Sequence, residues 1–370
     1  MEPYRRFKIL LAAAAITAVL SACGVGTGED TSPQAIRRAL EQGDFGRVQS
    51  LVAAAYDAEE ISGETRLLAG LNDLAISNGI GAENHFQVAK NMGIAAATID
   101  PLLAEALAHQ GKIEEARHLV TKANDTAASA IVEGIAARIA DQPWQAREAF
   151  ERAYRLNSKN QRLALDLAEM RTQIGLFDDA LRLTAQVIKA QPRNIRAYSL
   201  AGEVHMRRRN YAAAETAFAG ALKIQPSNGG ALTGKARAIY GQKKWAAAEK
   251  LLAALPGDLL DREDVQLLRG KIAARQRRHE AARTLFAGAG DSLFGDDEAM
   301  FLAAQGFAKR GEHWKAVRLL ESAVRARPDL PEYHAGLIRA YRAAGDNAAA
   351  ADRLAAVPLS LKDAPELSEP

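Results

Sequence analysis

Cysteine and aromatic residues are scarce in this sequence. Among 370 residues there is a single cysteine, Cys23, and Phe, Trp and Tyr together make up 6%. One cysteine cannot close an internal disulfide, so the fold must be held together by packing alone. Proline is also infrequent and alanine is abundant, a composition that favours closely packed helices over sheets. We therefore predict an all-α protein.

An excess of charge of one sign is lacking as well. The 48 Lys and Arg residues are nearly balanced by 45 Asp and Glu residues. Residues 1–22 contain three of the basic residues and one of the acidic ones, so the rest of the chain is closer still to neutral. A nucleic-acid-binding protein needs a strongly basic domain or face, and this composition argues against that class.

The sequence also lacks the common patterns of catalytic and metal-binding residues. Its seven histidines form no His-x-x-x-His pair of the zinc-protease type, and one cysteine cannot complete a metal site. There is no Gly-x-Ser-x-Gly elbow and no glycine loop that would hold a phosphate. Adjacent carboxylates such as Glu114-Glu115 fall in predicted first turns of helices, where the helix dipole favours them. We predict no catalytic activity, no cofactor and no metal site.

A short basic and apolar stretch opens the sequence. Arg5, Arg6 and Lys8 precede an uncharged run from Ile9 to Leu20. A membrane-spanning helix needs about 20 apolar residues, so this run is too short to span a bilayer and has the length of a signal-peptide core. We predict that residues 1–22 are a signal peptide that is removed.

The residues that follow the apolar run resemble the lipobox of bacterial lipoproteins. They read Leu20-Ser21-Ala22-Cys23. The resemblance implies that Cys23 is acylated, that residues 23–28 are a lipidated tether, and that the chain meets the membrane through this anchor. Two or more acyl chains anchor a protein stably. Gly24 stands where inner-membrane retention calls for Asp, which implies an outer-membrane lipoprotein on the periplasmic face. The alternative is an ordinary secretory signal beside which Cys23 falls by chance.

A period of 34 residues runs through most of the sequence, as in solenoid proteins. A small residue recurs at this spacing, with a large apolar residue usually four positions later and a small or apolar residue three further on. The recurring small residues are Ala146, Ala180, Ala214, Ala248, Ala282, Ala316 and Ala350. After one contraction of four residues the series continues upstream through Ala116, Ala82 and Val48. Ten units therefore run from about residue 29 to residue 358.

This pattern resembles the tetratricopeptide repeat. The unit that matches best carries Tyr198, Gly202, Tyr211, Ala214, Phe218, Ala221 and Pro226. The resemblance implies two antiparallel helices per unit, joined by turns that Gly43, Gly111, Gly175, Gly311 and Gly345 mark. It also implies that residues 29–358 stack into a right-handed superhelix with a concave groove. Several units lack the expected proline, and His279 and His313 replace the expected aromatic residue. We predict a short flexible tail at residues 359–370.

One segment carries a further resemblance. Residues 82–112 contain Ala82-Glu83-Asn84-His85-Phe86, then Pro101-Leu102-Leu103-Ala104, then Gln110-Gly111-Lys112. Their order is similar to that in the repeat lipoproteins of exosortase/PEP-CTERM exopolysaccharide systems. The similarity implies a scaffold for envelope proteins in exopolysaccharide secretion or another envelope assembly system.

Two binding functions stay open at this stage. The first is the protein scaffold, and the second is direct binding of an anionic polysaccharide or acidic peptide in the C-terminal part of the groove. A chaperone adaptor that clamps a carboxylate is less consistent with the sequence, because that clamp needs Asn at repeat position 9. The residues at that position are Glu169, Glu203, Arg237, Lys271, Gln305 and Arg339.

The candidate groove residues follow from the repeat positions that face inward in this fold. From the sixth unit on, these positions supply Arg207, Arg237, Tyr240, Lys271, Arg275, Lys309, Arg339 and Arg342, against fewer acidic residues, Glu203, Asp264, Glu298 and Glu332. A face with gathered positive charge would steer acidic partners toward it. The alternative is that Asp and Glu residues on adjacent helices neutralise these cations.

Overall fold

The computed structural model describes residues 30–120 and 126–368, and every regular element in these two ranges is a helix. The chain divides into two compact regions, residues 1–119 and 120–370, which we describe separately. We use the word unit only for the repeats. Cys23, together with the predicted signal peptide and tether, lies outside the described residues. In residues 30–120 and 126–368 no helix is both long enough and apolar enough to cross a membrane.

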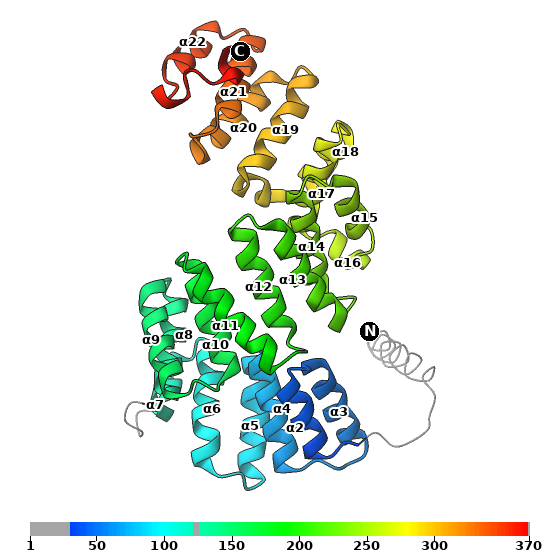
Figure 1. Ribbon diagram of the computed structural model, residues 1–370, viewed down its shortest axis with the longest axis vertical. Helices are drawn as coiled ribbons and strands as arrows, with labels where there is room; N and C mark the ends of the chain where they lie inside the picture. Colours follow the sequence, from blue (N-terminus) through cyan, green and yellow to red (C-terminus); the bar gives the residue numbers. More distant parts are fainter. Residues whose placement is uncertain (1–29, 121–125, 369–370) are drawn as a thin grey trace, which may run out of the picture. The chain divides into compact units, whose positions relative to one another are not determined.

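The first region, residues 1–119, consists of three helix pairs (Figure 1). Its elements are α2 (Pro33–Gln42), α3 (Phe45–Asp57), α4 (Gly63–Ala75), α5 (Gly79–Asn91), α6 (Ala96–His109) and α7 (Ile113–Val120), the last of which ends at the boundary.

The second region, residues 120–370, contains seven helix pairs that follow one another from α8 to α22 (Figure 1). The pairs are α8 (Ala127–Ile139) with α9 (Pro143–Leu156), α10 (Gln161–Gln173) with α11 (Phe177–Ala190), α12 (Ile195–Arg207) with α13 (Tyr211–Ile224), α14 (Gly229–Gly241) with α15 (Trp245–Leu252), α17 (Glu263–Arg275) with α18 (His279–Gly288), α19 (Asp297–Lys309) with α20 (His313–Ala326), and α21 (Pro331–Ala343) with α22 (Asn347–Ala355). Short helices stand beside them, α16 (Gly257–Leu260), η1 (Gly290–Gly295), η2 (Leu359–Leu361) and α23 (Pro365–Ser368).

The described helices confirm the predicted register. From α9 on, the second helix of each pair begins 34 residues after the previous one, at Pro143, Phe177, Tyr211, Trp245, His279, His313 and Asn347. The recurring small residues of the period are all buried, from Ala82 through Ala350, and Val48 is buried at the same position. The ten pairs seen in the described ranges match the ten units that the sequence predicts.

The turn inside each pair places one residue in the left-handed backbone region. The five glycines predicted to mark these turns, Gly43, Gly111, Gly175, Gly311 and Gly345, all have positive φ. In the other five units the same place is taken by Ser77, Asp141, Arg209, Lys243 and Arg277, with φ between 54° and 62°. An L-residue with a Cβ in this region costs about 1–2 kcal/mol, so these five turns carry strain that glycine would relieve.

Close contact between the two helices of a pair depends on glycine opposite phenylalanine. A Cβ added to Gly202 would lie 2.7 Å from the ring of Phe218, and one added to Gly234 of the next unit would lie 2.5 Å from it. The same contact recurs for Gly70 with Phe86, Gly134 with Phe150, and Gly270 with Phe286. Other repeats carry alanine at the glycine position and a smaller residue at the phenylalanine position, as Ala168 with Thr184, Ala236 with Leu252, and Ala304 with Leu320, and all six residues are buried.

Three second helices, α15, α18 and α22, are shortened without a change of register. The short helices α16, η1 and η2 follow them. Leu255 and Ala289 still reach the core at the position where intact second helices bury Ala221 and Ala323. The spacing of the buried residues, and not the continuity of the helix, therefore maintains the repeat.

The prediction of a flexible tail at residues 359–370 is wrong for the part that the structure describes. Residues 359–361 and 365–368 form η2 and α23, and Leu367 is buried against Ala335 and Ile338 of α21. The last first helix has no following unit to cover it, and the tail supplies the apolar side chains that do so. Pro358, Pro365 and Pro370 indicated disorder, but Leu361 and Leu367 pack in one apolar cluster with residues of α21.

We expect Gly202→Ala to lower the free energy of unfolding by about 1–3 kcal/mol, because the new Cβ would overlap the Phe218 ring. Gly306→Ala, also inside a first helix, should instead be neutral or stabilising by up to about 1 kcal/mol, since a Cβ there meets nothing within 4 Å. Urea denaturation of both variants measures the difference.

A second substitution checks the cause. Phe218→Leu introduced into Gly202→Ala recreates the pairing of Ala236 with Leu252 and should recover part of the loss. Additive effects of the two substitutions would contradict a direct contact.

Candidate functional site

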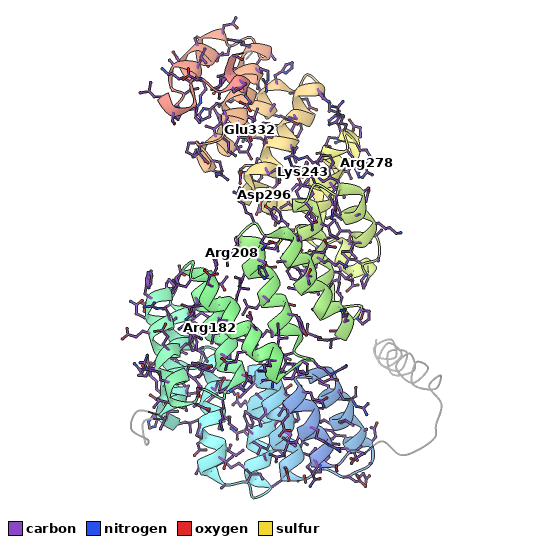
Figure 2. All side chains as sticks on the ribbon, viewed as in Figure 1. Arg182, Arg208, Lys243, Arg278, Asp296 and Glu332 are labelled. Atoms are coloured by element: carbon purple, nitrogen blue, oxygen red, sulfur yellow. The ribbon has the colours of Figure 1, made fainter. Side chains whose placement is uncertain are left out.

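The inward-facing positions of four successive first helices line a hollow of about 570 Å³ in the second region, residues 120–370. We call this the inner hollow. Its walls come mainly from α12, α14, α17 and α19 (Figure 2, where Lys243 and Asp296 are labelled). Its lining residues are Met206, Tyr211, Arg237, Tyr240, Gly241, Lys243, Trp245, Leu268, Lys271, Arg275, Asp296 and Glu298.

Glu298, in the first turn of α19, is the centre of a hydrogen-bonded network that joins three helices. Its carboxylate lies 2.8 Å from the ammonium nitrogen of Lys271 and pairs with the guanidinium of Arg275. The Tyr240 hydroxyl donates a hydrogen bond of 2.7 Å to the same carboxylate. Because Tyr240 belongs to α14 and the two cations to α17, the network links three consecutive units.

Asp296 completes the network from the N-terminus of α19. Its side chain accepts a hydrogen bond of 2.8 Å from the backbone nitrogen of Ala299 and so caps the helix. The same carboxylate accepts from Lys271 at 2.9 Å. Lys271 is thus held by two carboxylates, and only 14% of its side chain is exposed.

The network fixes the charge state of its members. Burial by itself would raise the pKa of Glu298, but Lys271 and the hydrogen bonds from Arg275, Lys271 and Tyr240 outweigh it and lower the pKa to about 2. Burial would lower the pKa of Lys271, yet Glu298 and Asp296 raise it above its usual value. The pKa of Tyr240 is raised, first by burial and then by the negative charge of Glu298. All three groups therefore keep one charge state near neutral pH.

Four predicted groove residues meet in the inner hollow, namely Arg237, Tyr240, Lys271 and Arg275. Each of the three cations among them is paired with a carboxylate. Arg237 pairs with Glu203 at 3.2 Å, and the other two cations pair with Asp296 and Glu298. The sequence counted Glu298 but missed Asp296, which precedes the first position of its helix. Its capping role, an Asp just before a helix start, was the available signal.

The other four predicted groove residues do not line the inner hollow. Arg207, Lys309, Arg339 and Arg342 are all exposed on first helices. Lys309 lies 2.8 Å from the Nε2 atom of His279. An ammonium group can only donate, so this imidazole nitrogen accepts. In the described ranges no group of three or more His, Cys, Asp or Glu side chains could hold a metal ion.

We expect Glu298→Gln to lower the free energy of unfolding of the second region by about 2 kcal/mol at pH 7. The substitution leaves Lys271 and Arg275 without their shared carboxylate. The pKa of Glu298 is lower in the folded protein than in the unfolded chain, where it is near 4.5. The resulting stabilisation is therefore fully present above pH 4.5 and is lost as the pH falls toward 2. The difference between variant and wild type should therefore shrink over that range. Hydrogen exchange of the α17 and α19 amides measures it.

Glu332→Gln is the matched control, because Glu332 occupies the same repeat position in the next first helix, α21. It should change the exchange rates little at any pH. Equal effects of the two substitutions, or a pH-independent effect of Glu298→Gln, would contradict the charge network as the cause.

Comparison with known proteins agrees with the helical arrangement. A family model for the tetratricopeptide repeat matches residues 137–204 and again residues 205–272. A search of curated proteins found no match for this sequence.

Several solved structures resemble the chain. The structure titled as the APC/C hetero-tetramer Cut9-Hcn1 aligns with 79% of the chain at a TM-score of 0.61 and 13% identity, and the aligned part spans 59% of that protein. PilW, titled a widely conserved type IV pilus biogenesis factor, aligns with 57% of the chain at a TM-score of 0.46 and 16% identity, over 97% of its own length. A tetratricopeptide repeat protein from Parabacteroides merdae aligns with 66% of the chain at 0.44 and 16% identity, over 98% of its length. Residues 137–272 are therefore tetratricopeptide repeats, and the chain has the all-helical fold of a tetratricopeptide-repeat solenoid.

Proposed function

We propose that this protein is a non-catalytic scaffold that binds a polypeptide partner in the inner hollow. The observation that carries the proposal is the composition of this surface, where cations, carboxylates and aromatic groups of successive first helices face one open space of about 570 Å³. Solenoids of this kind use their extended concave surfaces for binding. Because the surface carries charges of both signs, a partner with both acidic and basic groups fits it better than one with a single sign of charge.

The charge states in the inner hollow support a binding role over a catalytic one. A general acid or base needs a pKa near the working pH. The pKa of Glu298 is held near 2 and the pKa values of Lys271 and Tyr240 are raised, so none of them exchanges a proton readily at neutral pH.

The proposal places the scaffold in the bacterial envelope. The Leu20-Ser21-Ala22-Cys23 sequence supports acylation of Cys23, and Gly24 supports the periplasmic face of the outer membrane. The similarity of residues 82–112 to exopolysaccharide-system lipoproteins supports a role in exopolysaccharide secretion or another envelope assembly system.

A second candidate function is direct binding of an anionic polysaccharide or acidic peptide. The observation that favours it is that Lys243 lines the inner hollow and Arg207 and Arg339 are exposed, while none of the three has a carboxylate partner among the described residues. Each leaves a positive charge available to a polyanion, and salt would weaken such binding.

A photo-cross-linking residue at position 237 or 339 should capture the partner in living cells. Both positions lie on first helices, where Arg237 lines the inner hollow and Arg339 is exposed. The same residue at position 182, exposed on the second helix α11, is the control and should give no adduct. Electrophoresis of the products shows which positions react.

The nature of the adduct separates the two candidate functions. A discrete protein band from positions 237 and 339 supports the scaffold. A heterogeneous product that resists protease and disappears with raised salt supports the polyanion. Equal products from all three positions would overturn both candidates.

We expect Cys23→Ala to abolish incorporation of a clickable fatty acid and to release the protein from the membrane fraction, because the acylated thiol is the proposed anchor. Cys23→Ser gives a near-isosteric variant that should behave in the same way. Label retained on either variant, measured by in-gel fluorescence, would refute the anchor.

A further inference from the structure

A second cavity, separate from the inner hollow, lies between α18 and α19. It has a volume of about 480 Å³, within the range of ligand-binding pockets. We call it the α18–α19 pocket. Its apolar lining comes from Phe286 of α18, Leu293 of η1, and Leu302 and Phe307 of α19. The shortening of α18 brings η1 into this wall in place of a regular last turn.

The cavity is present because one unit lacks a side chain that other units have. The corresponding repeat position holds a larger buried residue in three units, Met170, Val204 and Ile272, and a buried alanine in two others, Ala238 and Ala340. The residue here is Gly306, which lines the pocket, and a Cβ built on it would meet no atom within 4 Å. Glycine inside a helix costs about 1 kcal/mol relative to alanine. No close contact in the described structure requires Gly306, so this cost has no packing explanation.

The rim of the pocket is rich in cations. Arg283, Arg310 and Lys315 line it. The carboxylate of Glu312 is shared by Arg310 at 2.9 Å and Lys315 at 2.6 Å. Glu280 is likewise shared by Arg310 and Arg283. Because two carboxylates serve three cations, N–H groups of the rim are left for a further acceptor.

The pKa of His279 is affected by the same local excess of positive charge. It lines the pocket, and its pKa is lowered by burial first and then by the charges of Lys309 and Arg277. A neutral His279 adds no cation of its own to the rim near neutral pH. The pocket thus combines an apolar floor with a rim that favours an anion.

We propose that the α18–α19 pocket binds an apolar side chain of a partner polypeptide that has carboxylates next to it in sequence. The apolar side chain would replace the atoms that Gly306 omits and contact Phe286, Leu302 and Phe307. The neighbouring carboxylates would accept hydrogen bonds from Arg283 and Lys315. This site goes beyond the proposed function, because it shares no lining residue with the inner hollow.

The test uses the purified full chain and a dye-labelled, blocked pentapeptide with one phenylalanine between two pairs of aspartates. Fluorescence polarisation at low salt measures its binding. Replacing the phenylalanine by alanine should weaken binding at least about tenfold, because burial of such a side chain is the main favourable contribution. Replacing the aspartates by asparagines should also weaken it, and only the aspartate peptide should respond to salt.

Gly306→Leu fills the pocket from within and should abolish binding of the peptide. Because the variant removes a helical glycine and adds apolar contact, its thermal midpoint should stay the same or rise, which separates lost binding from lost folding. Gln305→Leu adds the same side chain to the preceding, exposed residue and should bind as the wild type does. Arg283→Gln with Lys315→Gln should weaken the aspartate peptide but leave the asparagine peptide unchanged.

Three results would overturn the proposal. Unchanged affinity of a folded Gly306→Leu variant would place the peptide elsewhere. Equal binding of the alanine peptide would show that the apolar pocket is not used. Binding of decanoate with no binding of the pentapeptide would assign the cavity to a fatty acid and not to a polypeptide.

Discussion

The contact between glycine and phenylalanine where two helices of a pair cross is the constraint on which the rest of the structure depends. Phe218 fills the space that the absent Cβ atoms of Gly202 and Gly234 leave, and Phe86, Phe150 and Phe286 repeat the arrangement in every second unit. Other repeats carry alanine at the glycine position and threonine or leucine at the phenylalanine position. Interiors are close-packed, so the two residues must together fill a fixed space. This trade of volume lets units with different side chains share one spacing of 34 residues.

A constant spacing between units turns the inward positions of successive first helices into a continuous surface. Tyr240, Lys271 and Glu298 come from three units and still meet within hydrogen-bond distance. Arg237, Lys271 and Arg275 each pair with a carboxylate, and Lys243, which has no such partner among the described residues, is exposed. This distribution is expected because an unpaired charge that is mostly buried would be costly. The outcome is a surface with charges of both signs, in place of the single-sign surface that a count of basic residues indicates.

Binding is proposed at some of the places where this protein departs from its own repeat. Gly306 omits a core side chain and opens the α18–α19 pocket, and the shortened α18 leaves η1 to form one of its walls. Lys243, which lines the inner hollow, occupies a backbone position where glycine would be less strained. Local departures that packing does not require often accompany function.

The sequence by itself determined the all-helical fold, the ten units and the register, because crossing residues such as Ala146 and Ala214 must be small wherever the helices touch. It also identified Arg237, Tyr240, Lys271 and Arg275 as inward-facing, since repeat position alone decides on which side of a helix a residue lies. Only the tertiary structure decided what those residues touch. Asp296 neutralises Lys271 from outside the repeat helix, and Leu367 folds the predicted tail onto α21. Both contacts join residues far apart in the chain or outside the periodic pattern, and a period carries no information about such contacts.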